Sequence, residues 1–420
     1  MLLPRRYARL SRLPRTLLFD LLPVLLLFWS LVEVLSIRRA LQGADQQAEH
    51  DAETYTPGEK VFISSIHLHD EELLRAHWND ALLSLVEALG AGNVYVSIYE
   101  SNSLDNTKGA LRELGIALDN AGVRNTIVLD ESTRAQELQD ADKDGDGWIT
   151  TPAGDKEKRR IPYLAHLRNR ALAPLGELEA QGERFDRVLF LNDVVFTARD
   201  ILSLLRTNDG TYAAACALDF RHPPAFYDTF ATRDYHGHAP LTTTFPFFLS
   251  PASRHALTHG SPVPVRSCWN GAMAMDAAPF YTKLRKLAFR GYETSLARQH
   301  VEASECCLVH ADNPYASARG VFVNPGVRVA YYGMGAPTDG YAVVNPAGGG
   351  VWLSPWAILR GVWENRARRW LAPGWAMERG EAVLRGRIKA WEKDYGRREP
   401  GDFCAVDEMQ VLRMDGWAHV

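Results

Sequence analysis

The stretch FDRVLFLNDVVF, residues 185–196, has the composition of a buried strand until it reaches Asn192 and Asp193. An unpaired carboxylate in apolar surroundings costs several kcal/mol, so the Asp193 side chain must lie at an open sheet edge or have a partner. In parallel sheets, ligands bind beyond the carboxyl ends of the strands. Asn192 and Asp193 fall near such an end, which predicts a binding site there. The alternative is that Asp193 only caps the next helix, a role for which Thr197 competes.

Strand and helix patterns alternate from residue 60 onward. Strands are predicted over residues 60–67, 93–100, 125–130, 185–196 and 211–219. Helices are predicted over residues 70–90, 105–122 and 161–182, and Gly90 fits the end of the first of them. This order predicts an α/β fold, with a Rossmann-type, mostly parallel sheet flanked by helices. The chain becomes loop-rich after residue 220, and residues 376–398 are interpreted as a further helix.

Composition excludes several classes of protein. The chain has 420 residues, 46% of them hydrophobic, and a net charge of −4, which gives no general attraction to nucleic acid. No G-x-G-x-x-G follows the first strand, which excludes a nucleotide-binding dehydrogenase. The five cysteines lack metal-finger spacing. One or two disulfides are therefore possible in an oxidising lumen, with at least one thiol left over.

The N-terminal region predicts a membrane anchor. The stretch TLLFDLLPVLLLFWSLVEVLSI, residues 16–37, would be roughly 33 Å long as a helix at ~1.5 Å per residue, enough to span a bilayer core. Five arginines precede it and only Arg38 and Arg39 follow closely, so the positive-inside rule keeps the N-terminus cytosolic. A cleaved signal peptide is the main alternative, but its apolar core would be shorter. A buried amphipathic helix is the other alternative.

These patterns divide the chain into five parts. We expect a cytosolic tail over residues 1–15, a signal anchor over 16–37 and a polar stem over 38–59. An α/β domain then occupies 60–340, and a Trp-rich extension, 341–420, packs on it mainly through its tryptophans.

The stretch DKDGDGWI, residues 142–149, is similar to the start of an EF-hand loop. Its twelfth position, which requires a bidentate glutamate, is Ala153. Pro152 also stands where the exiting helix would begin. We interpret the stretch as a solvated loop, with weak cation binding as the alternative.

Arg168 and Asn169, in LRNRAL, lie about twenty residues before LFLND. Nucleotide-sugar transferases of the GT-A type commonly carry Arg-Asn on the helix before a strand that ends in a metal-binding Asp. Most of these enzymes have D-x-D at that strand end. Here the triplet is Leu191-Asn192-Asp193, so the first carboxylate is missing and metal dependence is left open.

An ordered set of motifs resembles the fungal cryptococcal-type α-1,3-mannosyltransferase family, whose members act in capsule and cell-surface glycan synthesis. The motifs are RIPYLAHLRNRALAPL, FDRVLFLNDVVF, AAACALDF, FYDTFATRDYHG, SCWNGAMAMDAAPF, ASECCLVHAD and VFVNPGVRVAYY. They cover roughly residues 60–332. The resemblance implies a GT-A-like fold, GDP-mannose as donor, a mannose-containing glycan as acceptor, a divalent metal such as Mn²⁺, and retention of the anomeric configuration. With the anchor, it implies a single-pass type II protein of the Golgi membrane whose catalytic domain is lumenal.

The resemblance also implies roles for individual residues. Those implied to bind the donor are Arg168, Asn169, Asn192, Asp193, Trp269, Asn270 and Gly271, with a buried core tryptophan as the alternative for Trp269. The metal would be held by Asp193, His310 and Asp312. Asp228, Arg233 and Asp234 are expected to line the acceptor side because they are polar residues in an otherwise aromatic loop. Glu305 would be the carboxylate near the reacting carbon, with a helix-surface salt bridge as its alternative. Asp219 is also expected to be catalytic. It would hold either the hydroxyls of the donor sugar or a structural arginine.

Two other functions stay open at this point. One is a transferase that uses another nucleotide sugar. The other is a non-catalytic lumenal protein, for glycan binding or trafficking, that keeps the shell of a transferase; the missing first carboxylate of D-x-D is its best support. Binding of GDP distinguishes the second from an enzyme.

Overall fold

The computed structural model describes residues 15–132, 134–139, 145, 147–151, 154–283, 285–332, 339–371, 374–414 and 416–420. Its main sheet has the strand order β10-β11-β13-β8-β12-β6-β1-β2-β3. The parallel part consists of β6 (Arg187–Leu191), β1 (Val61–His67), β2 (Val94–Glu100) and β3 (Arg124–Leu129). The other half consists of β12 (Ala272–Asp276), β8 (Ala214–His222), β13 (Val321–Tyr331), β11 (Val263–Ser267) and β10 (Arg233–Asp234).

The predicted α/β fold is confirmed, and its sheet is mixed, with β11 and β12 antiparallel to the strands beside them. Strand β12 lies antiparallel between β6 and β8, so the predicted fourth and fifth strands are not neighbours. The stretch 185–196 is also not one strand. It is divided into β6 and the short β7 (Val194–Val195), which pairs with the end of β13, while β9 (Ala225–Phe226) pairs with β8.

Helices cover both faces of the sheet because successive strand residues point to opposite faces. Phe62 and Phe190 face the core beneath α6 (Arg160–Ala180), while their neighbours Ile63 and Leu189 face the other helical layer. That layer contains α2 (Glu71–Leu73), η1 (Leu74–Trp78), α3 (Asn79–Leu89), α4 (Thr107–Asn120) and α7 (Ala198–Leu205). The predicted helix 70–90 is thus one continuous run with a π-turn in its middle, and it ends at Gly90 with a left-handed φ of 83°.

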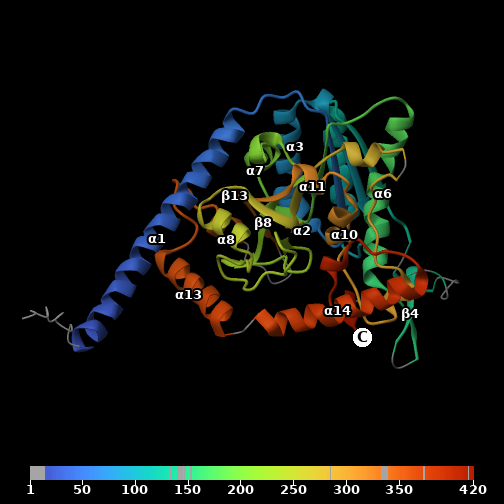
Figure 1. Ribbon diagram of the computed structural model, residues 1–420. Helices are drawn as coiled ribbons and strands as arrows, with labels where there is room; N and C mark the ends of the chain where they lie inside the picture. The colour runs from blue at the N-terminus through green and yellow to red at the C-terminus, as the bar shows by residue number, and fades with distance from the viewer. Residues whose placement is uncertain are drawn as a thin grey trace, which may run out of the picture.

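Helix α1 (Arg15–Glu53) joins the predicted anchor and stem into one helix. Figure 1 shows it running along one side of the molecule, with α6 on the opposite side. Its apolar first part, from Leu21 to Leu35, is largely exposed, and the described helix is long and apolar enough to cross a bilayer.

The prediction of a separate polar stem over 38–59 is wrong. Leu41, Ala44 and Ala48 are buried against the domain at helical spacing. Helix α1 lies so close to the domain that a Cβ at Gly260 would come within 2.3 Å of the Ala40 carbonyl oxygen, and one at Gly326 within 2.6 Å of that of Ala44. Most polar residues of this segment face solvent, Asp45 pairs with the buried Arg328, and the small residues allow the close packing.

The C-terminal extension is formed by α13 (Pro355–Leu371), α14 (Gly374–Tyr395) and a hairpin of β14 (Gln410–Arg413) and β15 (Gly416–His419). Trp352 and Trp391 are buried, as predicted. Trp356, Trp370 and Trp417 are exposed, so the expectation that the tryptophans mainly pack on the domain holds only in part. The helix predicted over 376–398 corresponds to α14.

The remaining elements connect these layers. They are α5 (Arg134–Leu138), β4 (Trp148–Thr150), β5 (Lys156–Lys158), α8 (Pro251–Thr258), α9 (Thr294–Ala297), α10 (Glu305–Asp312), α11 (Ala316–Arg319) and α12 (Gly340–Val344). Two disulfides, Cys216–Cys268 and Cys307–Cys404, leave Cys306 as a buried free thiol, which confirms the cysteine prediction. The aspartates of the EF-hand-like loop, Asp142, Asp144 and Asp146, lie outside the described residues.

Candidate functional site

The site begins where β6 ends. The Asn192 carbonyl accepts a hydrogen bond from the Trp78 indole at 3.0 Å, and its Oδ1 accepts one from the Trp269 indole at 2.9 Å. Asp193 follows and is partly exposed. The side chain of Thr197 accepts from Asp200 N in a capping box at the start of α7. Asp193 is therefore not the cap of this helix, and its carboxylate is available to a ligand.

The surroundings of Asp193 disfavour its charge. Burial, and then the charge of the neighbouring Asp70 carboxylate, raise the pKa of Asp193 to about 6. Asp70 accepts from His67 Nδ1 at 2.9 Å, and His67 Nε2 lies 2.9 Å from Ser65 Oγ. This chain of contacts fixes Asp70 at the end of β1, beside Asp193.

A divalent cation fits this pair of carboxylates. Mg²⁺ and Mn²⁺ prefer oxygen ligands, and Mg²⁺ commonly takes one or two carboxylates and completes its shell with phosphates and water. Among the described residues, no three His, Cys, Asp or Glu side chains are grouped to hold a metal. Asp193, with Asp70 beside it, therefore fits a cation that a diphosphate helps to bind, but not a metal site built by the protein alone.

A pocket of about 390 Å³ contains four predicted site residues: Arg168, Asp228, Trp269 and Glu305. Arg168 Nε donates to Glu305 Oε1 at 3.0 Å, and its guanidinium lies 4.1 Å from the centre of the Trp269 ring. Because the same indole donates to Asn192, this pocket adjoins the end of β6. A cation and a carboxylate thus meet beside Asp193. Trp269 is buried and its ring packs against Arg168, so its expected role in binding the donor is corrected to supporting this arginine.

Asp219 and Asp228 form a buried carboxyl pair. Asp228 N donates to Asp219 Oδ1 at 3.1 Å. Burial and the Asp228 charge raise the pKa of Asp219 well above its usual range, and burial also raises the pKa of Asp228. Only Asp228 lines the pocket, while Asp219 is 0% exposed. The expected catalytic role of Asp219 is therefore corrected to a positioning role, because no substrate can reach its side chain.

Three residues implied to bind the donor have structural roles instead. Asn169 exchanges two hydrogen bonds with the backbone of Phe289. Asn270 is buried and donates to the Ala217 carbonyl at 2.8 Å. Gly271 has a φ of 75°, and a Cβ there would come within 2.9 Å of two valine side chains. These residues position Trp269 and β12, and their side chains are not free to bind a ligand.

Two of the residues expected on the acceptor side are also corrected. Arg233 is buried and donates to the carbonyl oxygens of Phe403 and Cys404 at 3.0 and 3.1 Å. Asp234 is buried and accepts from the backbone nitrogens of Ser250, His236 and His238. Both side chains stabilise loops through hydrogen bonds to the backbone, and neither lines the pocket.

The predicted metal set of Asp193, His310 and Asp312 is not assembled. Asp312 is paired with Arg290, whose Nε lies 2.6 Å from Asp312 Oδ2. His310 is buried, and its Nε2 lies 2.7 Å from the Cys268 carbonyl oxygen. Of the three, only Asp193 is a metal-ligand candidate.

His310 predicts a dependence of stability on pH. Burial lowers the pKa of His310 from 6.5 to about 4. Its stabilising contribution is therefore fully present above pH 6.5 and is lost as the pH falls toward 4, by about 3 kcal/mol in total. We expect His310→Gln to remove this part of the slope of unfolding free energy against pH, with the exposed His236→Gln as control. An unchanged slope in His310→Gln would contradict the assignment.

The sequence interpretation missed several residues of the site. Tyr331 ends β13 and lines the pocket, where burial and the charges of Asp219 and Asp193 raise its pKa well above the usual range. The strand-end rule that selected Asp193 would also have found Asp70, since it lies three residues beyond the end of β1. The hairpin residues that line the pocket, Gln410 and Trp417 among them, carried no motif.

Comparisons with known proteins agree with the region that holds the site. The family model described as "Cryptococcal mannosyltransferase 1" matches residues 60–312. A curated relative, alpha-1,3-mannosyltransferase CMT1 of Cryptococcus neoformans var. neoformans serotype D, is 29% identical over 284 residues, which are 61% of this chain and 55% of that protein. The chain thus spans about half the length of the curated relative that it matches.

Solved structures are similar at low identity. The mannosyltransferase PcManGT from Pyrobaculum calidifontis, in complex with GDP-Man and Mn²⁺, is 13% identical, with 87% of this chain and 95% of that chain covered and a TM-score of 0.36. TarS 1–349 of S. aureus is 10% identical, with 75% and 74% covered and a TM-score of 0.35. The family match contains Arg168, Asp193, Trp269 and Glu305 and ends before the C-terminal hairpin.

Proposed function

Because the chain belongs to the family described as Cryptococcal mannosyltransferase 1, we propose that it transfers mannose from GDP-mannose to an α-mannoside acceptor, with an α-1,3 linkage and retention of configuration. The pocket in which Arg168, Trp269 and Glu305 meet beside Asp193 is the observation that carries this proposal. It combines a cation for a diphosphate, supported by the Trp269 ring beneath it, with a carboxylate for the reacting carbon.

In the proposed reaction, the bond from the mannose anomeric carbon to the GDP phosphate oxygen breaks, and a bond to an acceptor oxygen forms. Arg168 stabilises the negative charge that develops on the leaving diphosphate. A divalent cation at Asp193, such as Mn²⁺, would neutralise more of that charge when bound. Trp269 packs against Arg168 and holds this arginine in place, and Glu305 stabilises the positive charge on the anomeric carbon or attacks it. The acceptor hydroxyl proton passes to the leaving phosphate in the same-face route.

The test uses the full chain in detergent. It should bind GDP, release GDP from GDP-mannose when an α-mannoside is present, and lose that activity in EDTA until Mn²⁺ is restored. A panel of other nucleotide sugars tests the donor. Leu191 in place of the first D-x-D carboxylate favours the alternative of a non-catalytic glycan-binding protein, which would neither bind GDP nor release it.

We also propose that α1 anchors the protein in the Golgi membrane with the domain in the lumen. The exposed apolar run from Leu21 to Leu35 supports a bilayer contact. Ser30 and Glu33, in the second half of the predicted span, are paired with Trp363 and Arg366 of α13, so the domain lies against this part of the helix. The excess of arginines before the span supports the orientation.

Two single substitutions test the orientation, since the sequence holds no N-x-S/T acceptor of its own. Thr54→Asn creates Asn-Tyr-Thr in the exposed turn after α1, and Glu131→Asn creates Asn-Ser-Thr at a second exposed position. We expect both variants to gain a glycan that an endoglycosidase removes, because both sites would face the lumen. If neither variant is glycosylated in cells, the domain is cytosolic.

A further inference from the structure

The pocket that holds Glu305 has one wall from the far end of the chain. The hairpin residues that line it are Gln410, Trp417 and His419, together with Glu408 just before β14. We propose that this hairpin is the subsite for the saccharide acceptor, with Trp417 as the platform on which a sugar ring stacks. The inference rests on the proposed function and names a binding site outside the region matched by the family model.

The hairpin is held rigidly against the domain. Val411 and Leu412 are buried in separate apolar clusters, next to Ala297 and Tyr163 respectively. Arg413 pairs with Glu157 of β5. The buried side of the hairpin thus fixes its position, and its other side faces the pocket.

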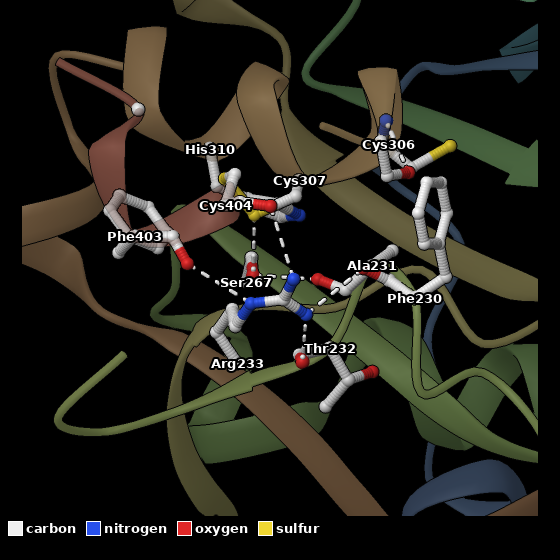
Figure 2. Close-up of a disulfide and its surroundings, with 12 residues drawn as sticks. Phe230, Ala231, Thr232, Arg233, Ser267, Cys306, Cys307, His310, Phe403 and Cys404 are labelled. Atoms are coloured by element: carbon white, nitrogen blue, oxygen red, sulfur yellow. Dashed lines mark hydrogen bonds between the residues drawn. A yellow bond between two sulfur atoms is a disulfide. The ribbon is translucent and has the colours of Figure 1, made fainter. Parts of the chain in front are cut away.

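A disulfide couples the start of the hairpin segment to the helix that carries Glu305. Figure 2 shows Cys307, on α10, joined to Cys404, with the Arg233 guanidinium donating to the backbone carbonyls beside it. Glu305 lies two residues before Cys307 on the same helix. The reacting carboxylate and the hairpin are therefore parts of one covalently tied unit, as is required if the acceptor hydroxyl is to be positioned at the reacting carbon.

The side chains on this wall have the chemistry that binds neutral sugars. The Trp417 residue is 45% exposed, and its ring lies 4.8 Å from the Arg160 guanidinium and 4.9 Å from the His419 ring. Arg160 also donates to Gln410 Oε1 at 2.6 Å. Gln410 is buried and its amide also donates to Glu408, so it holds Arg160 and Glu408 in place. The exposed indole offers a stacking face, and the Glu408 carboxylate and His419 imidazole beside it offer hydrogen bonds to hydroxyls.

The two ends of the pocket are suited to different ligands. At one end, the Trp269 indole donates a hydrogen bond to Asn192, next to Asp193, where a diphosphate and a cation fit. At the hairpin end, the Arg160 charge is directed to Trp417 and Gln410. This arrangement favours a nucleotide sugar at the first end and an uncharged saccharide at the second, and Glu305 lines the same pocket.

The test compares Trp417→Ala and Trp417→Phe in the full chain, with Trp370→Ala as control. Trp370 is 66% exposed on α13 and does not line the pocket. With GDP-mannose as donor and α-linked mannotriose as acceptor, Trp417→Ala should raise the acceptor KM by about tenfold, the loss of one stacking contact. The GDP-mannose KM and the GDP Kd should stay as in wild type, Trp417→Phe should restore most of the acceptor KM, and the control should be normal.

An unchanged acceptor KM in an active Trp417→Ala variant overturns this inference and leaves the proposed function standing. If wild type neither binds GDP nor transfers any sugar, the proposed function fails, and calorimetric titration with mannotriose then decides the subsite. Loss of mannotriose binding in Trp417→Ala supports it. Equal affinity in the variant, or no binding by wild type, overturns it.

Discussion

Asp193→Asn should reduce mannosyl transfer by about 100- to 1,000-fold, the range for removing a group that stabilises transition-state charge. The amide keeps the shape of the side chain but removes the charge that would hold a divalent cation at the end of β6. The variant should fold at least as well as wild type at neutral pH. Burial and the neighbouring Asp70 raise the pKa of Asp193 to about 6, so its ionised form costs stability as the pH rises from about 4 through 6.

The activity and the thermal unfolding midpoint of Asp193→Asn are both compared with those of wild type, which separates a loss of function from a loss of stability. Asp80→Asn, at an exposed position in the first turn of α3, is the matched control and should change neither. In wild type, EDTA should abolish transfer and Mn²⁺ should restore it, whereas Mn²⁺ should not rescue Asp193→Asn. Full activity of wild type in EDTA would remove the metal from the proposal, and normal turnover of the variant would remove Asp193 from the site.

Much of the fold, and one end of the site, could be predicted from the sequence because local patterns carry them. The strands of the parallel half are continuous apolar runs between amphipathic helices, which predicts β1, β2, β3 and β6 directly. The position of Asn192 and Asp193 follows from the rule that ligands bind beyond the carboxyl ends of parallel strands. Strand β12 has no such signal, because AMAMD is short and its antiparallel insertion depends on contacts with β6 and β8.

The metal ligands were predicted wrongly because residues of one sequence motif were assumed to face the same site. Glu305, His310 and Asp312 lie on the same short helix, but His310 is about 140° around it from Glu305, at ~100° per residue. It therefore faces the core and the Cys268 carbonyl. Asp312 is on the Glu305 side but about 10 Å further along, at ~1.5 Å per residue, where it meets Arg290.

Other errors have a different cause. Arg233 and Asp234 are polar residues in an aromatic loop, a composition typical of binding surfaces. Their side chains are instead hydrogen-bonded to buried backbone groups. The stem looked like a spacer because its polar face dominates the composition, while its contacts depend on Gly260 and Gly326, which are distant in sequence. The hairpin at the pocket could not be predicted, since a disulfide and buried contacts place it there and not its own pattern.

Glu305→Gln should lower kcat by at least ~100-fold, or about 2.7 kcal/mol at 1.36 kcal/mol per decade. Glu305 is 3% exposed and accepts from Arg168 Nε at 3.0 Å, so its charge serves both the reacting carbon and the arginine that faces the diphosphate. The amide keeps the size of the side chain and can still accept from Arg168. GDP affinity should therefore be unchanged or slightly higher, because Arg168 loses a competing anion. Glu87→Gln, at an exposed position of α3 that does not line the Glu305 pocket, is the control and should keep kcat unchanged.

A covalent adduct, and not the product, identifies the step that Glu305 serves. Retention requires either attack by a carboxylate on the anomeric carbon or a same-face route in which the leaving phosphate takes the acceptor proton. Both give an α-linked mannoside from GDP-mannose, and only the first forms a covalent bond to Glu305. Mass spectrometry of wild type quenched during turnover should detect that adduct if Glu305 is the nucleophile, and Glu305→Gln should lack it. A β-linked product would refute retention, and near-normal kcat in Glu305→Gln would remove Glu305 from the reaction while leaving the family assignment intact.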